Sequence, residues 1–178
     1  ENEIKKSGGC LYIVGGKVRD LISGKNQSSS PDLVTDLDTH SSIKVLNKLK
    51  IPFLKVGEKF GSLLVKDGKD SFDLTSMRKD ILPDGRWTKI EFTSDIILDS
   101  KRRDFSINSI YCDLSGNLID PNNGIKDLKN KKVKFIGKLE DRIKEDHLRI
   151  LRFIRFSLTY SNLIDAKDLK KCQKYSVN

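Results

Sequence analysis

The stretch CLYIVGGKVRDLISG, residues 10–24, joins a short apolar run to an amphipathic segment through two glycines. The run before Gly15 predicts a buried strand. After Gly16, apolar side chains recur with helical spacing as far as Gly24, which is a natural helix stop. The stretch therefore predicts a strand, a tight turn and a helix in direct succession.

The double glycine also predicts a binding site. Backbone N–H groups exposed where such a turn enters a helix can hold an anion, and Arg19 follows in the first helical turn, where it can contact a phosphate. Gly-Gly turns are more often only turns, so this signal needs support from other segments.

The segment TDLDT, residues 35–39, carries two aspartates one residue apart. If the segment is extended, Asp36 and Asp38 share one face and repel each other unless a cation or basic group lies nearby. Asp73, on a strand that could pair nearby, is a third candidate. Two or three such carboxylates can hold Mg²⁺ for nucleotidyl transfer. The alternatives are a solvated strand face or a helix cap.

The remaining pattern predicts a mixed α+β fold. Residues 61–77 read as a hairpin about Asp67–Gly68, and a helix is expected after His40 with its N-cap at Ser41 or Ser42. Residues 78–92, with Pro, Asp and Gly at their centre, read as a long mobile loop. The dense Ile, Leu and Phe pattern of residues 138–160 predicts helix.

The composition favours a polyanionic partner without requiring one. The net charge is +9, and the lysines cluster in residues 126–138 and 167–174. Attraction to nucleic acid and a solvated lysine-rich surface are both consistent with this charge. Aromatic residues make up only 7% of the chain and are not interleaved with the basic runs, so a base-stacking surface is not indicated.

Other counts exclude several classes of protein. Three widely spaced cysteines indicate a reducing compartment and argue against a disulfide framework. Two histidines exclude a three-histidine metal site. No apolar run is long enough to span a membrane, so we expect a cytoplasmic protein, or an organellar one if a targeting segment precedes Glu1.

Two arginine-rich motifs complete the candidate site. The motif RRDFSIN, residues 102–108, has two interpretations. It is either a capped helix with an internal ion pair, or a site where one arginine faces a triphosphate and Asp104 orients that arginine. In EDHLRILRFIRF, residues 145–156, a helix would align Asp146, Arg149 and Arg152 on one side. Such side chains either form surface ion pairs or present donors and acceptors to a base.

Taken together, these motifs closely resemble one family, the class II CCA-adding enzymes (tRNA nucleotidyltransferases) and the related bacterial poly(A) polymerases. The resemblance covers residues 11–156, and its motifs occur in the family's order: LYIVGGKVRDLISGK, TDLDT, FDLTSMRKDILPDGRW, RRDFSINSIYCDLSGNLIDPNNGIKDLKNKKVKFIG and RIKEDHLRILRFIRF. It implies a nucleotidyltransferase head domain of the DNA polymerase β superfamily in residues 1–136. Residues 137–178 would begin a helical neck, with the body and tail domains absent.

The resemblance also implies roles for individual residues. Asp36 and Asp38 match the pair that binds catalytic Mg²⁺. The implied partners are the 3′ end of tRNA, CTP and ATP. The residues that match nucleotide contacts or their supports are Gly16, Arg19, Arg103, Asp104, Asp146, Arg149 and Arg152. Of these, Asp146 and Arg149 match the pair that reads the incoming base without a nucleic-acid template, with Arg152 beside them, and Asp104 supports Arg103.

Several alternatives stay open. The segment SSSPDLVTD before the aspartate pair is longer than in the family, and Trp87 replaces a commoner histidine. An enzyme that adds only A, or a poly(A) polymerase, shares these motifs, whereas the long loop of residues 78–92 disfavours an enzyme that adds only CC. A non-catalytic RNA-binding domain would not need a metal pair. A Rossmann dinucleotide-binding protein lacks support because Lys17 interrupts the G-x-G-x-x-G pattern.

Overall fold

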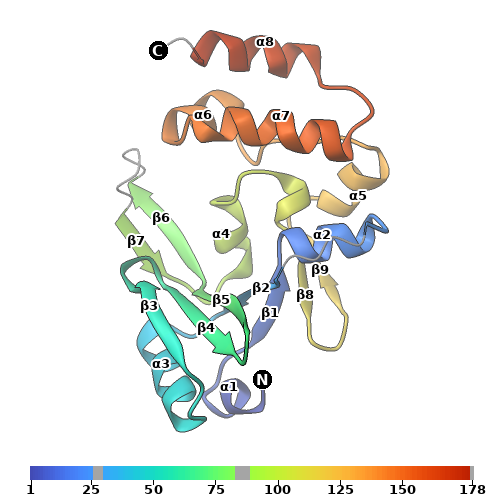
Figure 1. Cartoon of the computed structure of the whole chain (residues 1–178). Coiled ribbons are helices and arrows are strands. Elements are labelled where there is room, and N and C mark those ends of the chain that lie inside the picture. The colour runs from blue at the N-terminus through green and yellow to red at the C-terminus, as the bar shows by residue number, and fades with distance from the viewer. Residues whose placement is uncertain (26–29, 83–88, 177–178) are drawn as a thin grey trace.

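The computed structural model describes residues 1–25, 30–82 and 89–176. Helices in this part of the chain are α1 (Asn2–Lys6), α2 (Gly16–Ile22), α3 (Thr39–Lys48), α4 (Ile96–Lys101), α5 (Gly124–Lys129), α6 (Leu139–Glu145), α7 (Leu148–Tyr160) and α8 (Ala166–Tyr175). Figure 1 shows α6, α7 and α8 gathered at one end of the molecule, with α2, α4 and α5 between them and the sheet.

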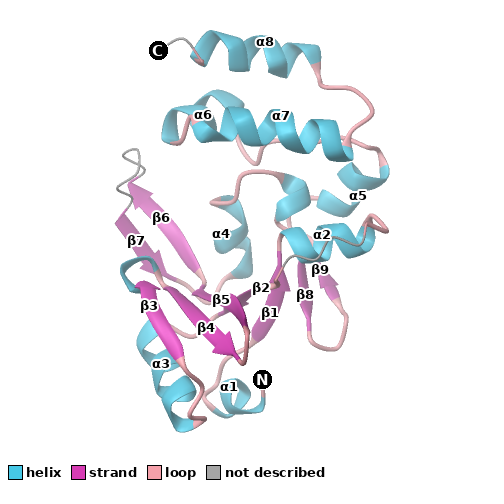
Figure 2. Ribbon diagram, viewed as in Figure 1, coloured by secondary structure: helices cyan, strands magenta, loops and turns pink. Residues whose placement is uncertain are grey.

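The described residues form a main sheet of seven strands in the order β3-β4-β5-β2-β1-β8-β9 (Figure 2). The strands are β1 (Leu11–Val14), β2 (Asp32–Thr35), β3 (Phe53–Gly57), β4 (Ser62–Asp67), β5 (Asp70–Ser76), β8 (Tyr111–Asp113) and β9 (Leu118–Ile119). Because β2 and β5 run parallel while β1 and β2 run antiparallel, the sheet is mixed. This confirms the predicted α+β fold with a small mixed sheet.

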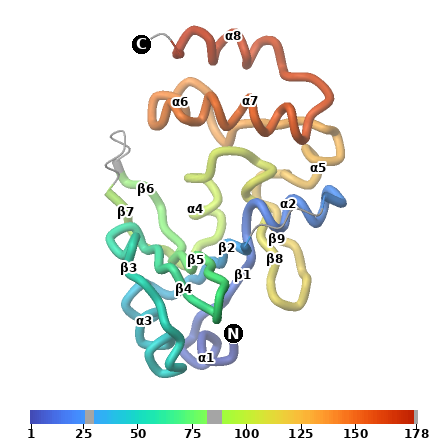
Figure 3. The backbone as a smooth tube through the Cα atoms, viewed as in Figure 1, coloured from blue at the N-terminus to red at the C-terminus, as the bar shows by residue number. Residues whose placement is uncertain are grey.

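The chain path brings distant segments together at one end of the sheet. Figure 3 shows α2 beside α5 and beside the short 3-10 turn Ser106–Asn108, although these segments are far apart in the sequence. The double glycine at the end of β1 therefore lies near the arginine-rich motif that follows α4.

A hydrophobic core joins the head to the helices that follow it. Phe105 is fully buried, and its ring lies 4.7 Å from that of Phe135 and 5.6 Å from that of Phe156 on α7. Ile143 on α6 and Cys172 on α8 are buried in the same cluster. The boundary after residue 136 stays a prediction, but the segments on its two sides share this core.

The prediction that Asp36 and Asp38 lie on a strand is wrong. Strand β2 ends at Thr35, and Asp38 is the N-cap of α3, where its carboxylate accepts the N–H of Ser41 at 2.6 Å. Asp38 thereby takes the capping position that was expected at Ser41 or Ser42. At the start of a helix the Asp38 carboxylate accepts a backbone N–H that would otherwise have no partner. On a solvent-facing strand the same carboxylate would have no such backbone group to bind.

Residues 78–92 also differ from the predicted loop. They form the arms of a second hairpin, β6 (Arg78–Leu82) and β7 (Lys89–Phe92), in which Arg78 pairs with Phe92. The Pro-Asp-Gly centre, residues 83–85, and Trp87 lie outside the described residues. The residues that flank this centre are β-prone enough to pair with each other, which the prediction of a loop did not allow for.

Candidate active site

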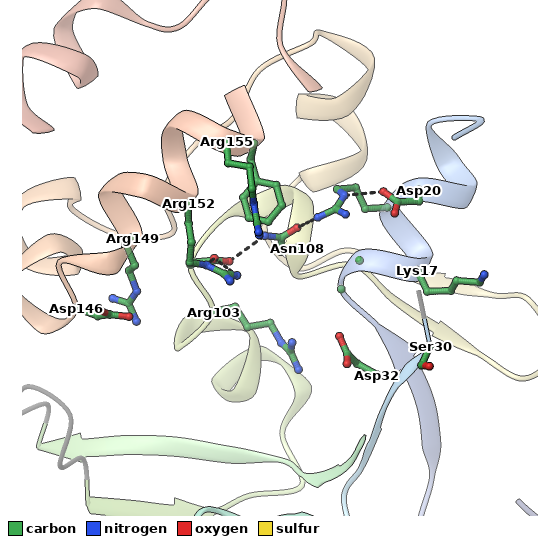
Figure 4. Close-up of a pocket in the computed structure, with 15 residues that line it drawn as sticks. Lys17, Asp20, Ser30, Asp32, Arg103, Asn108, Asp146, Arg149, Arg152 and Arg155 are labelled. Atoms are coloured by element: carbon green, nitrogen blue, oxygen red, sulfur yellow. Dashed lines mark hydrogen bonds and ion pairs between the residues drawn. The ribbon is translucent and has the colours of Figure 1, made fainter. Parts of the chain in front are cut away.

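A cavity of about 520 Å³ lies where α2, α7 and the segment after α4 meet. Residues 15–20, 103–108 and 146–156 each contribute side chains to its wall (Figure 4). All the residues that were predicted to contact a nucleotide line this cavity or lie in its wall: Gly16, Arg19, Arg103, Asp104, Asp146, Arg149 and Arg152. Three motifs, the first and last of which are 130 positions apart from Gly16 to Asp146, therefore converge on one site.

The cavity also includes side chains that the sequence reasoning did not select. They are Lys17, Asp20, Ser30, Asp32, Asn108, Arg155 and Phe156. Lys17, Asp20, Asn108, Arg155 and Phe156 fall inside the quoted motifs, so motif membership could have flagged them. Asp32 precedes an unremarkable Leu-Val-Thr run, and only the strand pairing reveals its position.

Arg19 is held rigidly at the back of the cavity. Its side chain is only 7% exposed; its Nε donates to Asp20 at 2.9 Å and its Nη1 donates to Asn108 at 2.5 Å. The guanidinium lies over the rings of Phe156, at 4.9 Å, and Tyr160, at 4.3 Å. Because the Tyr160 hydroxyl in turn donates to Asp20, α7 fixes the orientation of this arginine.

Asp104 orients Arg152 rather than Arg103, which corrects the expectation. The Arg152 guanidinium donates to the Asp104 carboxylate at 2.6–2.7 Å, and the Asn108 amide donates to the same carboxylate at 3.1 Å. Asn108 therefore joins Asp104 to Arg19, so a continuous chain of hydrogen bonds crosses the cavity from α2 to α7. The partner of Asp104 lies 48 positions away, which no local pattern could indicate.

Asp99 is the carboxylate that supports Arg103. It is fully buried and accepts from Arg103 at 3.0 Å, from Arg102 at 2.8 Å and from the Tyr111 hydroxyl at 2.7 Å. Burial acts to raise the pKa of Asp99, but the charges of Arg103 and Arg102 and these hydrogen bonds outweigh it and lower the pKa to about 2. Asp99 also accepts the N–H of Arg78, which ties the β6–β7 hairpin to the same site.

Asp146 and Arg149 lie at the end of the cavity that α6 and α7 form (Figure 4). Asp146 lies between the two helices, not within one, because α6 ends at Glu145 and α7 begins at Leu148. Its carboxylate accepts the N–H of Leu148 at 3.0 Å, while Arg149 donates to Glu145 at 2.5 Å. The two side chains therefore have separate supports and leave other polar atoms available to a ligand.

Asp36 and Asp38 do not reach the cavity. In the antiparallel ladder of β1 and β2, Thr35 pairs with Leu11, so Asp36 lies beside the start of β1. Its carboxylate accepts the N–H of Cys10 at 2.6 Å. The double glycine follows the other end of β1, five residues beyond Cys10 and therefore roughly 17 Å away at the usual rise per strand residue.

Asp32 and Asp73 are two carboxylates that lie close together at the edge of the cavity, on the sheet side. Asp32 lines it and, with Arg103, also lines an adjoining cavity of about 420 Å³ that contains Asp73. The parallel pairing of Leu33 with Leu74 puts Asp32 and Asp73 on the same face of neighbouring strands. The pKa of Asp32 is raised, first by burial and then by the negative charge of Asp73. Asp73 was predicted as a possible third metal ligand beside Asp36 and Asp38. It lies beside Asp32 instead.

This pair fits a hard divalent cation only in part. No group of three or more His, Cys, Asp or Glu side chains converges on a metal site in the part of the chain that the structure describes. Two carboxylates that repel each other across one cleft are nevertheless suitable Mg²⁺ ligands, because Mg²⁺ usually completes its shell with water and substrate phosphates. The donor set therefore matches a metal that arrives with a nucleotide.

The comparison with protein families identifies the sequence. Residues 11–134 match the family described as the poly A polymerase head domain. The chain is 39% identical over 162 residues to the human mitochondrial CCA tRNA nucleotidyltransferase 1, covering 87% of this chain and 35% of that protein. It is 32% identical over 176 residues to a CCA-adding enzyme of Streptococcus pyogenes, covering 98% of this chain and 42% of that protein. The chain thus spans about two fifths of the curated relatives that it matches.

Solved structures share the fold. The CCA-adding enzyme of Bacillus stearothermophilus in complex with CTP superposes with a TM-score of 0.79 at 28% identity, over 96% of this chain and 40% of that one. A tRNA nucleotidyltransferase complexed with a primer tRNA and an incoming ATP analog gives a TM-score of 0.76 at 27% identity, over 99% of this chain and 50% of that one. The described residues contain no helix that is long and apolar enough to cross a membrane.

Proposed function

The chain belongs to the poly A polymerase head-domain family, and from this premise we propose that it is the catalytic portion of an enzyme that adds CMP and AMP to the 3′ end of tRNA. The convergence of the double glycine, the Arg-Arg-Asp motif and the Asp146–Arg149 pair on one cavity carries the proposal. Relatives named as CCA-adding enzymes, one of them solved with CTP, support this substrate class.

In this proposal the nucleotide lies along the cavity. Asp146 and Arg149 bind the Watson–Crick edge of cytosine or adenine, since the carboxylate accepts from an exocyclic amino group and the guanidinium donates to a ring nitrogen. The phosphates extend toward Gly16 and Arg19. The fixed guanidinium of Arg19 suits this role because its orientation does not have to be acquired on binding.

Mg²⁺ would be held by Asp32 and Asp73 and would neutralise charge on the reacting phosphate. This assignment replaces the one to Asp36 and Asp38, whose carboxylates already accept backbone N–H groups at the far end of β2. Arg103, which reaches both cavities, adds positive charge at the point where they join.

The reaction is a nucleotidyl transfer. The acceptor 3′ oxygen forms a bond to the α-phosphorus of CTP or ATP, the bond from that phosphorus to the β-phosphate oxygen breaks, and pyrophosphate leaves. The proton of the 3′ hydroxyl passes to a neighbouring carboxylate or to water. Asp32 and Asp73 both line the adjoining cavity, from which an acceptor would approach, and Asp73 is the one of the two that does not also line the nucleotide cavity.

A poly(A) polymerase or an enzyme that adds only A is the second candidate, because the matching family model is described by poly A polymerase. Incubating the full-length protein with tRNA that lacks its terminal CCA, and with each labelled nucleotide alone, distinguishes these activities. Addition of C followed by A supports CCA addition. Addition of A alone, to tRNA ending in CC, supports the A-adding enzyme, and long A tracts on other RNAs support the polymerase.

A non-catalytic RNA-binding domain is the alternative from another class. It predicts that tRNA is bound but that no labelled nucleotide is incorporated in the same assay. The activity is expected wherever tRNA is matured, which for the human relative is the mitochondrion by name. We therefore expect the protein in the cytoplasm or in a tRNA-containing organelle.

A further inference from the structure

The cavity of the proposed nucleotide site holds more positive charge than its ion pairs use. In the described part of the chain, six cationic and four acidic side chains line it, the cationic ones being Lys17, Arg19, Arg103, Arg149, Arg152 and Arg155. Four of these already hold a carboxylate, in the pairs Arg19–Asp20, Arg103–Asp99, Arg149–Glu145 and Arg152–Asp104. Among the described residues, Lys17 and Arg155 remain without an ion pair.

These two cations differ in what else they contact. The Arg155 guanidinium lies over the ring of Phe156 at 4.7 Å, so it contributes to the packing of a buried aromatic side chain. The Lys17 side chain has no aromatic contact or hydrogen bond within the described residues, and the residue as a whole is half-buried at the cavity wall. Lys17 is therefore the cation whose charge the fold itself leaves unused.

The position of Lys17 indicates which part of a nucleotide it meets. Figure 4 shows Lys17 on α2 at the opposite side of the view from Asp146 and Arg149, with its side chain directed away from them. The double glycine, which directly precedes Lys17 in the chain, lines the same cavity. A base held at Asp146 and Arg149 directs its phosphates toward the glycines, and the last phosphate then arrives at Lys17. A lysine ammonium is a compact charge that suits a terminal phosphate, which needs no planar, bidentate partner.

We infer that Lys17 binds the γ-phosphate of the incoming nucleotide and, after transfer, the pyrophosphate product. This inference rests on the proposed function. It makes Lys17 the residue that selects nucleoside triphosphates over diphosphates and monophosphates, independently of the base. Pyrophosphate should accordingly inhibit the enzyme through Lys17.

Calorimetric titration of the full-length protein with ATP, ADP and AMP tests the inference. Lys17→Ala should weaken ATP binding by about tenfold, as expected for one charge-assisted contact in a partly exposed site, and should leave AMP binding unchanged. Lys17→Arg should restore most of the ATP affinity. Lys66→Ala, which removes an exposed lysine on β4 away from both cavities, controls for the change in net charge.

The possible outcomes distinguish failure of the proposed function from failure of the role assigned to Lys17. If the wild-type protein binds none of the three nucleotides, the proposed function fails and the role of Lys17 fails with it. If the wild type binds ATP and Lys17→Ala binds it equally well, only the inference about Lys17 is overturned. An equal loss for ATP, ADP and AMP also overturns it, because Lys17 would then act on the cavity as a whole.

Discussion

Asp32 lies directly opposite Val14 in the antiparallel ladder of β1 and β2, so its carboxylate stands next to the double glycine that follows β1. Asp36 lies beyond the other end of the same ladder, next to Cys10. Asp32 and Asp36 are only four positions apart in the sequence, yet Asp32 lies at the cavity and Asp36 lies outside it. This separation can be tested with one pair of variants.

We predict that Asp32→Asn lowers nucleotide addition by about a hundredfold or more, because it removes a metal-binding charge from the reacting centre. Asp36→Asn, the matched control, should retain most of the activity and lose at most about 1 kcal/mol of stability with the Cys10 hydrogen bond. Single-turnover addition of labelled CTP by the full-length protein measures both. A large loss in Asp36→Asn with normal folding would return the metal site to residues 36–38.

Asp99 should make stability depend on acidity. Its pKa is about 2 in the folded chain against an ordinary value of 3.8, so its ionised form stabilises the fold above pH 4 by about 2 kcal/mol. That contribution should be lost as the pH falls from about 4 to 2. Asp99→Asn should be destabilised by about 3 kcal/mol at pH 7, because Arg102 and Arg103 lose their partner, and should show a flatter profile below pH 4.

Urea unfolding at pH 7, 4 and 3 measures this prediction. Asp70→Asn, at an exposed position of the β4–β5 hairpin, is the control and should follow the wild-type profile. The same acid dependence in Asp99→Asn and in the wild type would show that other carboxylates govern acid unfolding.

Asp146 should determine the choice of base. We predict that Asp146→Ala relaxes discrimination against UTP and GTP more than it slows addition of CTP, by roughly ten- to hundredfold in the ratio of rates, because mismatched buried groups cost about 1–3 kcal/mol each. Incorporation of each of the four nucleotides by the full-length protein measures the ratio. Asp141→Ala, on the exposed face of α6, is the control. An unchanged preference in Asp146→Ala would mean that its carboxylate only caps α7.

Asn108 should act through the two groups that it joins. Asn108→Ala removes the acceptor of Arg19 and the donor to Asp104, so we predict a loss of about 1–3 kcal/mol in stability. The nucleotide concentration that half-saturates addition should also rise several-fold. Asn117→Ala removes a comparable side-chain contact from the exposed β8–β9 turn and should change neither quantity. Lost stability with unchanged half-saturation would assign Asn108 to the fold alone.

Local signals were sufficient for much of the molecule. Gly15 adopts a positive φ of 76° at the turn, and α2 ends before Gly24, as the quoted stretch predicts. The hairpin about Gly68 and the helical content of residues 138–160 also depend on nearby residues, and the structure confirms them. In each case the determining interactions lie within a few positions of one another.

The errors arose where the partner is distant in the sequence. The alternation of polar and apolar residues in TDLDT predicts an extended segment. It does not reveal whether a neighbouring strand continues to pair with that segment. Pairing with β1 ends at Leu11, and a helix start then takes Asp38. Asp104 was likewise assigned to the adjacent Arg103, because its actual partner on α7 can be recognised only after the chain has folded back.

The buried ring of Phe105 has a consequence for how the protein is made. Its neighbours Phe153 and Phe156 leave the ribosome about fifty residues after it. Until they do, Phe105 has no cover on that side, and Arg19 lacks the rings that hold its guanidinium. A nascent chain should therefore remain unable to retain a nucleotide, and should attract chaperones, until residue 160 has left the ribosome. Affinity for the nucleotide would then appear in a single late step of biogenesis.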